Sequence, residues 1–140
     1  MPLPYPDDLT SLVLRTDFGD DESWDTVRAA LDAADKYPHA TYVSDLRFAE
    51  VSVQALLDEE AAAEEDDQIT YVFLADAITM GDPSHPLLAV DLSAEPGRTF
   101  RVPPQWFPDV SANLSIANMD FAEFADAVDE SGTFRDFDDG

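Results

Sequence analysis

The chain has 140 residues and carries 31 Asp and Glu against seven Lys and Arg, which gives a formal charge of −24. This charge excludes binding to DNA, RNA or anionic membranes through phosphate neutralisation, because that mode needs clustered Lys and Arg. The hydrophobic fraction of 45% is too high for a disordered acidic chain, and the length suits one domain. We therefore expect a single acidic globular domain over residues 1–140.

The composition also bears on the compartment. No cysteine is present, so disulfides, thiolate nucleophiles and cysteine-based zinc sites are excluded. The sequence shows no signal-peptide pattern and no apolar run long enough to span a bilayer. We expect a cytoplasmic protein. A solubility or salt-adaptation trait explains much of its acidity, and explains it equally well as a role of the acids in binding does.

Short apolar runs alternate with stretches of helical periodicity along the chain. The predicted elements are, in order, a strand over 11–16, a helix from Asp20 to the Tyr37-Pro38 pair, a strand over 41–44, a helix over 53–60, strands over 69–75, 86–92 and 99–102, and a helix from 121 to near Gly132. Asp20 and Ser52 stand at the starts of the first two helices as N-caps. The pair Asp120 and Glu123 forms a capping box before the last helix.

This alternation predicts the fold class. We expect an α/β sandwich, built as one domain with a mixed sheet of about five strands and about three helices. The run over 69–75 is nearly all apolar, so its strand is expected at the centre of the sheet, covered on both faces. Pro103, Pro104 and Pro108 are expected to break regular structure after the last strand. The strand order and the oligomeric state do not follow from these patterns.

Three aspartates, Asp17, Asp45 and Asp76, each stand just past the end of a predicted strand. If these strands are parallel neighbours, the carboxylates meet at the carboxyl edge of the sheet, where open α/β folds bind ligands. Carboxylate oxygens are the ligands that hard cations such as Mg²⁺ prefer. A small metal-dependent enzyme or ligand-binding site is one hypothesis, and local capping of turns explains the same aspartates without a metal.

Motifs for other chemistry are weak or missing. His39 and His85 are the only imidazoles, and Ser84 beside His85 lacks the G-x-S-x-G context that presents a nucleophilic serine. The sequence has neither a G-x-G-x-x-G motif nor a P-loop, which excludes nucleotide binding by those routes. No catalytic residue and no cofactor is predicted, and an enzymatic role is not favoured.

The acidic segment 58–67 holds seven acids in ten residues. A solvated helix end and loop explains it most simply. Rows of carboxylates can also imitate the phosphates of DNA, so an inhibitor that mimics DNA is a further hypothesis.

Residues 96–119 differ from the rest of the chain because they hold one acid and two arginines. Arg, Trp and Phe are enriched in the hot spots of protein interfaces. The candidate partner-binding residues of this segment are Arg98, Arg101, Trp106, Phe107, Asn113 and Asn118. A loop that pins the core of the domain would use the same residue types, so both interpretations stay open.

Four blocks of the sequence resemble a known family: LVLRTDF at 12–18, PLLAVDL at 86–92, PGRTFRVPP at 96–104 and NLSIANMDFAEFADAV at 113–128. Over nearly its whole length the chain is similar to short acidic proteins, known mainly from actinomycete-type bacteria, that share a domain of unknown function. The last block is the most specific. The resemblance implies a bacterial cytoplasmic origin, and it carries no reaction, cofactor or substrate over to any residue here.

From the residues we expect a non-enzymatic protein-interaction or regulatory module, of the immunity or inhibitor type. Its partner is expected to be a protein, and a basic one by charge complementarity. The metal-dependent enzyme or ligand-binding domain and the DNA mimic are the alternatives. Neither nucleic acid nor a membrane is expected as a direct partner.

Overall fold

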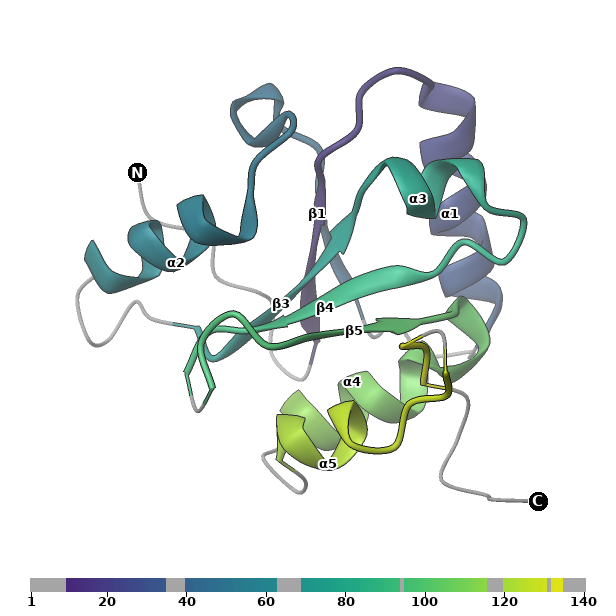
Figure 1. Cartoon of the computed structure of the whole chain (residues 1–140). Helices are drawn as coiled ribbons and strands as arrows, with labels where there is room; N and C mark the ends of the chain where they lie inside the picture. The colour runs from purple at the N-terminus through teal and green to yellow at the C-terminus, as the bar shows by residue number, and fades with distance from the viewer. Residues whose placement is uncertain are drawn as a thin grey trace.

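A five-stranded mixed sheet forms the centre of the computed structural model, which describes residues 10–34, 40–62, 69–93, 95–115, 120–130 and 132–134 (Figure 1). The strands are β1 (Ser11–Arg15), β2 (Ala40–Val43), β3 (Tyr71–Ala75), β4 (Leu87–Asp91) and β5 (Thr99–Val102), and their order across the sheet is β2-β1-β3-β4-β5. The described helices are α1 (Asp21–Ala33), α2 (Val53–Ala62), α3 (Ala77–Gly81), α4 (Phe107–Ser115) and α5 (Phe121–Ala125), with 3₁₀ turns η1 (Leu46–Phe48) and η3 (Pro104–Trp106). The predicted α/β class with a mixed sheet is confirmed.

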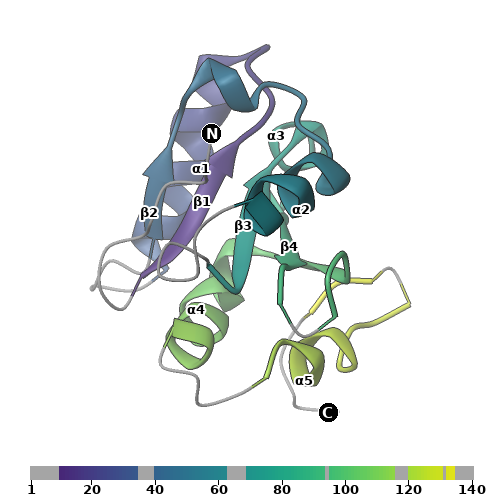
Figure 2. The ribbon, with the colours of Figure 1, turned by 90° about the vertical axis from the view of Figure 1, so that its left-hand side faces the viewer.

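The parallel half of the sheet determines where a ligand crevice would lie. β2 and β3 both run parallel to β1 and lie on opposite sides of it, whereas β4 and β5 pair antiparallel. Right-handed crossovers that leave in opposite directions place their helices on opposite faces. α1 therefore covers one face and α2 the other, as two perpendicular views show (Figures 1 and 2). The connections diverge at the carboxyl ends of β1 and β3, the topological switch point of the sheet.

Two hydrophobic clusters, one on each face, hold these layers together. Alternate side chains of β1 point to opposite faces, so Val13 joins the first cluster while Leu12 and Leu14 join the second. α1, α4 and α5 supply the first cluster, and η1 and α2 supply the second. β3 lies between β1 and β4 with four of its five residues buried, which confirms its predicted central position.

Aromatic rings close the first cluster near the β5 edge of the sheet. The centroid of the Phe100 ring lies 4.9 Å from that of Phe121 and 6.4 Å from that of Phe134. The backbone of residues 132–134 also pairs with Arg101, whose amide and carbonyl both form hydrogen bonds to it. The chain after α5 thereby covers part of an edge that would otherwise expose unpaired backbone groups.

The predicted helix starts are confirmed by their caps. The Asp20 carboxylate accepts hydrogen bonds from amides in the first turn of α1. Ser52 Oγ accepts from the Ala55 amide at 3.1 Å, and the Glu123 carboxylate accepts from the Asp120 amide at 2.8 Å. These side chains satisfy amides that have no partner within the helix, so the chain signals each start locally.

Later helices differ from the sequence-based expectation. The sequence does not predict α3 or α4, and α4 contains Pro108, which was expected to break regular structure. A proline is tolerated in the first turn of a helix because the amide it lacks would have no helical partner there. α5 ends at Ala125, earlier than the predicted end near Gly132. The predicted helix stop at Tyr37-Pro38 lies outside the described residues.

Among the helices that the structure describes, none is both long and apolar enough to cross a bilayer.

Glu60 on α2 yields a test of this packing. Burial raises the pKa of its carboxyl, against a smaller opposing effect of a backbone hydrogen bond at Ile69. Because the folded pKa lies above the unfolded one, Glu60 favours the folded state at low pH, and this contribution is lost as the pH rises through the folded pKa. We expect Glu60→Gln to raise the free energy of unfolding at about pH 7 and the gain to shrink toward about pH 4.

Glu59→Gln is the matched control, because it removes the same charge from the neighbouring and less buried position. Denaturant unfolding of both variants and the wild type at the two pH values measures the effect. An equal gain from both variants would assign the effect to net charge and contradict a specific cost of burying Glu60.

Candidate functional site

A protein side chain occupies the carboxyl edge of the sheet, beside the switch point. Arg15 is the last residue of β1 and is only 3% exposed. Its guanidinium donates from Nε to the Asp17 carbonyl at 2.9 Å and from Nη2 to the Asp21 carboxylate at 2.8 Å. Nη1 lies 3.5 Å from Ser44 Oγ, just past the end of β2. The three guanidinium nitrogens of Arg15 are thus directed at groups on three segments: the loop after β1, the helix α1 and the loop after β2.

Two aromatic rings cover the same guanidinium. Its central carbon lies 4.5 Å from the centroid of the Phe18 ring and 5.7 Å from that of Trp24. A planar, weakly hydrated cation is well suited to such stacking, and each cation–π contact contributes more as water is excluded. The loop after β1 and the first turns of α1 supply these partners, so the chain folds back over the end of its own strand.

Backbone hydrogen bonds join the loops at this edge close to the strand ends. The Thr16 amide, just after β1, donates to the Ala75 carbonyl at the end of β3 at 3.0 Å. The Glu50 amide, in the loop after η1, donates to the Thr16 carbonyl at 2.7 Å. Glu50 adopts a left-handed backbone conformation, with φ at 57°, which is uncommon for a residue other than glycine. The three loops therefore form one connected edge.

The aspartates predicted at the strand ends all lie at this edge, and each binds its own loop. Asp17 accepts from the Gly19 amide at 2.9 Å, and Asp45 caps η1 by accepting from the Arg47 amide at 3.1 Å. Asp76 caps α3. Within the described part of the chain, no group of three or more His, Cys, Asp or Glu side chains is arranged to hold a metal. The geometry thus matches the capping interpretation of these residues.

Asp76 is also the acceptor of a bidentate ion pair with Arg101. Both of its carboxylate oxygens accept from the Arg101 guanidinium, at 2.9 and 2.8 Å. Burial alone would raise the pKa of Asp76, but the hydrogen bonds from Arg101 and from the Thr79 amide and hydroxyl outweigh it and hold the pKa below its usual value. Arg101 reaches this acid from β5, across β4, so the pair ties the antiparallel half of the sheet to the switch point.

Within residues 96–115, the described part of the segment, the aromatic side chains contribute to the core. Phe107 is 1% exposed and packs its ring 5.0 Å from that of Phe73 on the central strand, so it does not lie on a surface patch. Trp106 is half-buried against the same cluster. Arg98 is more exposed than Arg101 and forms ion pairs with Glu95 and Asp126.

The two asparagines complete the predicted set. Asn113 Nδ2 donates to the Asp109 carbonyl within α4 at 2.8 Å. Asn118 lies outside the described residues, as does part of the acidic segment 58–67. The structure therefore does not gather the five described members of this set into one exposed patch: Phe107 is in the core, and both arginines are bound to acids.

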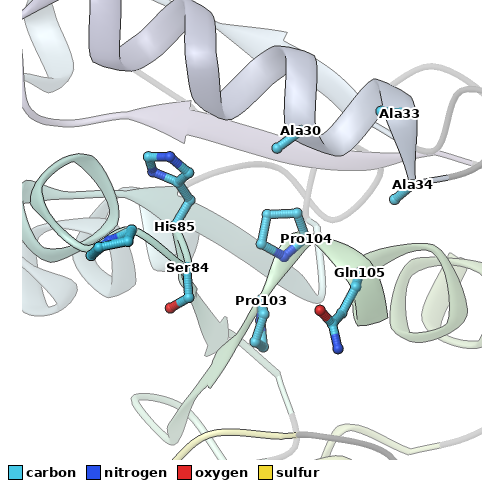
Figure 3. Close-up of a pocket in the computed structure, with 9 residues that line it drawn as sticks. Ala30, Ala33, Ala34, Ser84, His85, Pro103, Pro104 and Gln105 are labelled. Atoms are coloured by element: carbon cyan, nitrogen blue, oxygen red, sulfur yellow. The ribbon is translucent and has the colours of Figure 1, made fainter.

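A pocket of about 370 Å³ lies elsewhere, between α1 and the loops 83–85 and 103–105 (Figure 3). Its walls are mostly alanine and proline, with Ser84, His85 and Gln105 as the polar groups. Ser84 Oγ donates to the Asp82 carboxylate at 2.8 Å, and His85 Nδ1 lies 2.9 Å from the Thr79 carbonyl, to which it donates. Both side chains are thus used to shape their own loop, and they do not form a nucleophile and base pair.

Sequence reasoning missed Arg15 and two exposed apolar residues, Leu46 and Ile78. Arg15 follows three apolar residues in a predicted strand and is followed by Phe18 and Trp24, which is a signal for a stacked cation. No comparable signal marks the exposure of Leu46 or Ile78, because both occur in short helical segments, η1 and α3, that only the tertiary structure orients.

We expect Arg101→Met to lower the free energy of unfolding by about 2 kcal/mol, because it leaves the Asp76 carboxylate partly buried without its guanidinium. The folded pKa of Asp76 is depressed, so the loss should be present above its unfolded pKa and should fade as the pH drops through the folded value. Denaturant unfolding at neutral and acidic pH measures this difference. Arg98→Met is the control, since its ion pairs are more exposed, and an equal loss there would contradict a special role for the Asp76–Arg101 pair.

We expect Arg15→Lys to lower the free energy of unfolding by about 1–2 kcal/mol although the charge is kept, because an ammonium loses the planar fork and the stacking on Phe18 and Trp24. Arg28→Lys is the matched control: Arg28 lies 5.8 Å from the centroid of the Trp24 ring, with a side chain that is 43% exposed. Thermal unfolding compares the two. A loss from Arg28→Lys as large as that from Arg15→Lys would show that burial of the guanidinium is not the cause.

Comparison with known proteins assigns a family and no activity. A domain of unknown function, DUF6924, matches residues 10–137, a stretch that includes Arg15 and the Asp76–Arg101 pair. No curated protein matches the chain. The resemblance to a domain of unknown function is therefore confirmed, and the chain belongs to the DUF6924 family.

Proposed function

We propose that the chain is a non-enzymatic protein-interaction module that binds a positively charged protein partner. The observation that carries this proposal is the carboxyl edge of the sheet beside the switch point, where Arg15 is 3% exposed and its guanidinium is bound by the protein's own groups on the loop after β1, on α1 and after β2. Open α/β folds admit small ligands at such a point. Because the protein's own acceptors and rings already bind the Arg15 guanidinium, recognition at this edge falls to its outer surface, which suits contact with a macromolecule.

The charge of the chain supports a basic partner. A formal charge of −24 on 140 residues produces a strong negative field around the domain. Such a field accelerates the approach of a positively charged protein and repels an acidic one. It also opposes association with nucleic acids and anionic lipids.

The contact region in this proposal is not centred on residues 96–119. Phe107 is part of the core, and Arg98 and Arg101 are held in ion pairs with Asp126 and Asp76. A partner that used these residues would have to break those pairs, which costs free energy before any contact is gained.

The proposal extends to the cellular setting and to the kind of regulatory role. A cysteine-free acidic chain is compatible with a bacterial cytoplasmic setting, where thiol chemistry is not used for cross-links. A small module that binds a basic protein also suits an inhibitor or immunity role, in which occupancy of the partner is the whole function.

The test is a titration with identified partners. The tagged chain is used to capture proteins from an extract of its source organism at low salt, and each captured protein is purified and titrated against the chain by calorimetry. We expect a basic protein that binds with defined stoichiometry and a dissociation constant of about 1 μM or below. Its affinity should fall by about tenfold or more between about 50 and 500 mM salt, because screening weakens charge attraction.

An unrelated acidic protein of similar size and charge is the control for this experiment. Captured proteins that bind the control as tightly would show that bulk charge alone retains them. That result for every captured protein would contradict the proposed function.

A further inference from the structure

Two large apolar side chains stand exposed at the carboxyl edge of the sheet. Leu46 is 72% exposed and Ile78 is 54% exposed, and they are the two such side chains found in the described residues. Leu46 begins η1, just after β2, and Ile78 lies in α3, just after β3. Scattered exposed apolar residues are normal on a surface, so their placement is the informative feature.

The strand order places these residues on either side of the same loop. Because β2, β1 and β3 are neighbouring parallel strands, η1, the loop 16–20 and α3 follow one another along one edge, as both views show (Figures 1 and 2). The buried Phe48 of η1 belongs to the second cluster and the buried Met80 of α3 to the first, so the two segments flank the loop 16–20 from opposite faces of the sheet. Phe18, half-buried, lies in the middle loop. We call this row of Leu46, Phe18 and Ile78 with its three segments the carboxyl-edge surface.

Acidic side chains surround this row. The three segments 16–22, 44–50 and 76–82 together contain eight Asp and Glu residues and one Arg, Arg47, and two of the acids, Asp21 and Asp76, are paired with Arg15 and Arg101. Arg47 is itself engaged, since its guanidinium lies 4.6 Å from the Phe48 ring and 3.6 Å from the Asp45 carboxylate. An apolar centre with an acidic rim matches a partner whose apolar side chains are flanked by Lys and Arg.

The surface is held in shape before a partner arrives. The amides of Thr16 and Glu50 fasten the three loops to one another, and the Arg15 guanidinium stacks on the ring of Phe18. A surface that is already ordered loses little conformational entropy on binding, so more of the contact energy appears as affinity.

We propose that the carboxyl-edge surface binds a basic amphipathic helix of a partner protein, with the apolar side of the helix on Leu46, Phe18 and Ile78. This inference rests on the proposed function and adds the place and the chemistry of contact. A second copy of this chain is the wrong occupant, because it would bring a second acidic rim against the first. Anionic lipid is disfavoured for the same reason.

Two synthetic peptides of equal length and charge test the proposal. One is an amphipathic Lys/Leu helix, and in the other every Leu is replaced by Ser. We expect the Lys/Leu peptide to bind the wild-type chain with amide chemical-shift changes concentrated in residues 16–22, 44–50 and 76–82. The Lys/Ser peptide should bind about tenfold more weakly or less, because it lacks the apolar contact.

Variants then assign the contact to named residues. Leu46→Ser with Ile78→Ser should weaken binding of the Lys/Leu peptide by about tenfold, with the melting temperature nearly unchanged because both side chains are exposed. Ala29→Ser with Ala61→Ser is the matched control at exposed positions on α1 and α2, and it should leave the affinity unchanged. Glu22→Gln with Glu50→Gln should reduce the salt dependence of binding, which checks the rim without altering the apolar row.

The results of the peptide and variant experiments test the carboxyl-edge surface separately from the proposed function. Shift changes elsewhere, equal binding of both peptides, no binding of the Lys/Leu peptide, or an unchanged affinity in the Leu46 and Ile78 double variant would each overturn the carboxyl-edge surface. None of these results would remove a partner found by the titration described above. Failure of that titration alone would overturn the proposed function while leaving a peptide-binding surface on the chain.

Discussion

The buried guanidinium of Arg15 sets the conditions for the rest of this edge. Removing a cation from water costs several kcal/mol unless every donor finds an acceptor and the ring faces are covered. The Asp17 carbonyl and the Asp21 carboxylate supply acceptors, and Phe18 and Trp24 supply the covering rings. All four belong to the short stretch after β1. The chain satisfies Arg15 by folding that stretch back over the end of the strand, and the Asp20 cap marks where α1 begins.

The antiparallel half of the sheet depends on a second guanidinium used in the same way. Arg101 on β5 reaches the Asp76 carboxylate at the start of α3. A residue on an edge strand therefore stabilises the loop that follows the central strand, β3. Asp76 meanwhile caps α3 through Thr79. Two arginines thus fix two of the loops at the carboxyl edge, one from within the parallel half and one from outside it. The edge behaves as a single structural unit because these ion pairs cross element boundaries.

Features that depend on neighbouring residues were predictable, and features that depend on distant pairing were not. The five strands and the caps at Asp20 and Ser52 follow from short apolar runs and single polar side chains. α4 escaped prediction because the position of Pro108 within the first turn, rather than its presence, decides its effect. The Asp76–Arg101 pair joins residues 25 positions apart through β4, and no local pattern encodes that contact. The aspartates were placed at the correct edge, but their roles as caps required the loop geometry.

The negative charge of the chain bears on how its exposed apolar side chains can be tolerated. Leu46 and Ile78 on an uncharged domain would invite self-association, since exposed apolar side chains are the usual starting point of aggregation. Here any second copy presents the same acidic rim, so repulsion acts before the apolar contact can form. In the function proposed above, a basic partner is attracted by the acidic rim before it gains the apolar contact. The charge would then reserve the apolar row for one class of protein, and this selectivity would weaken as salt shortens the range of the field.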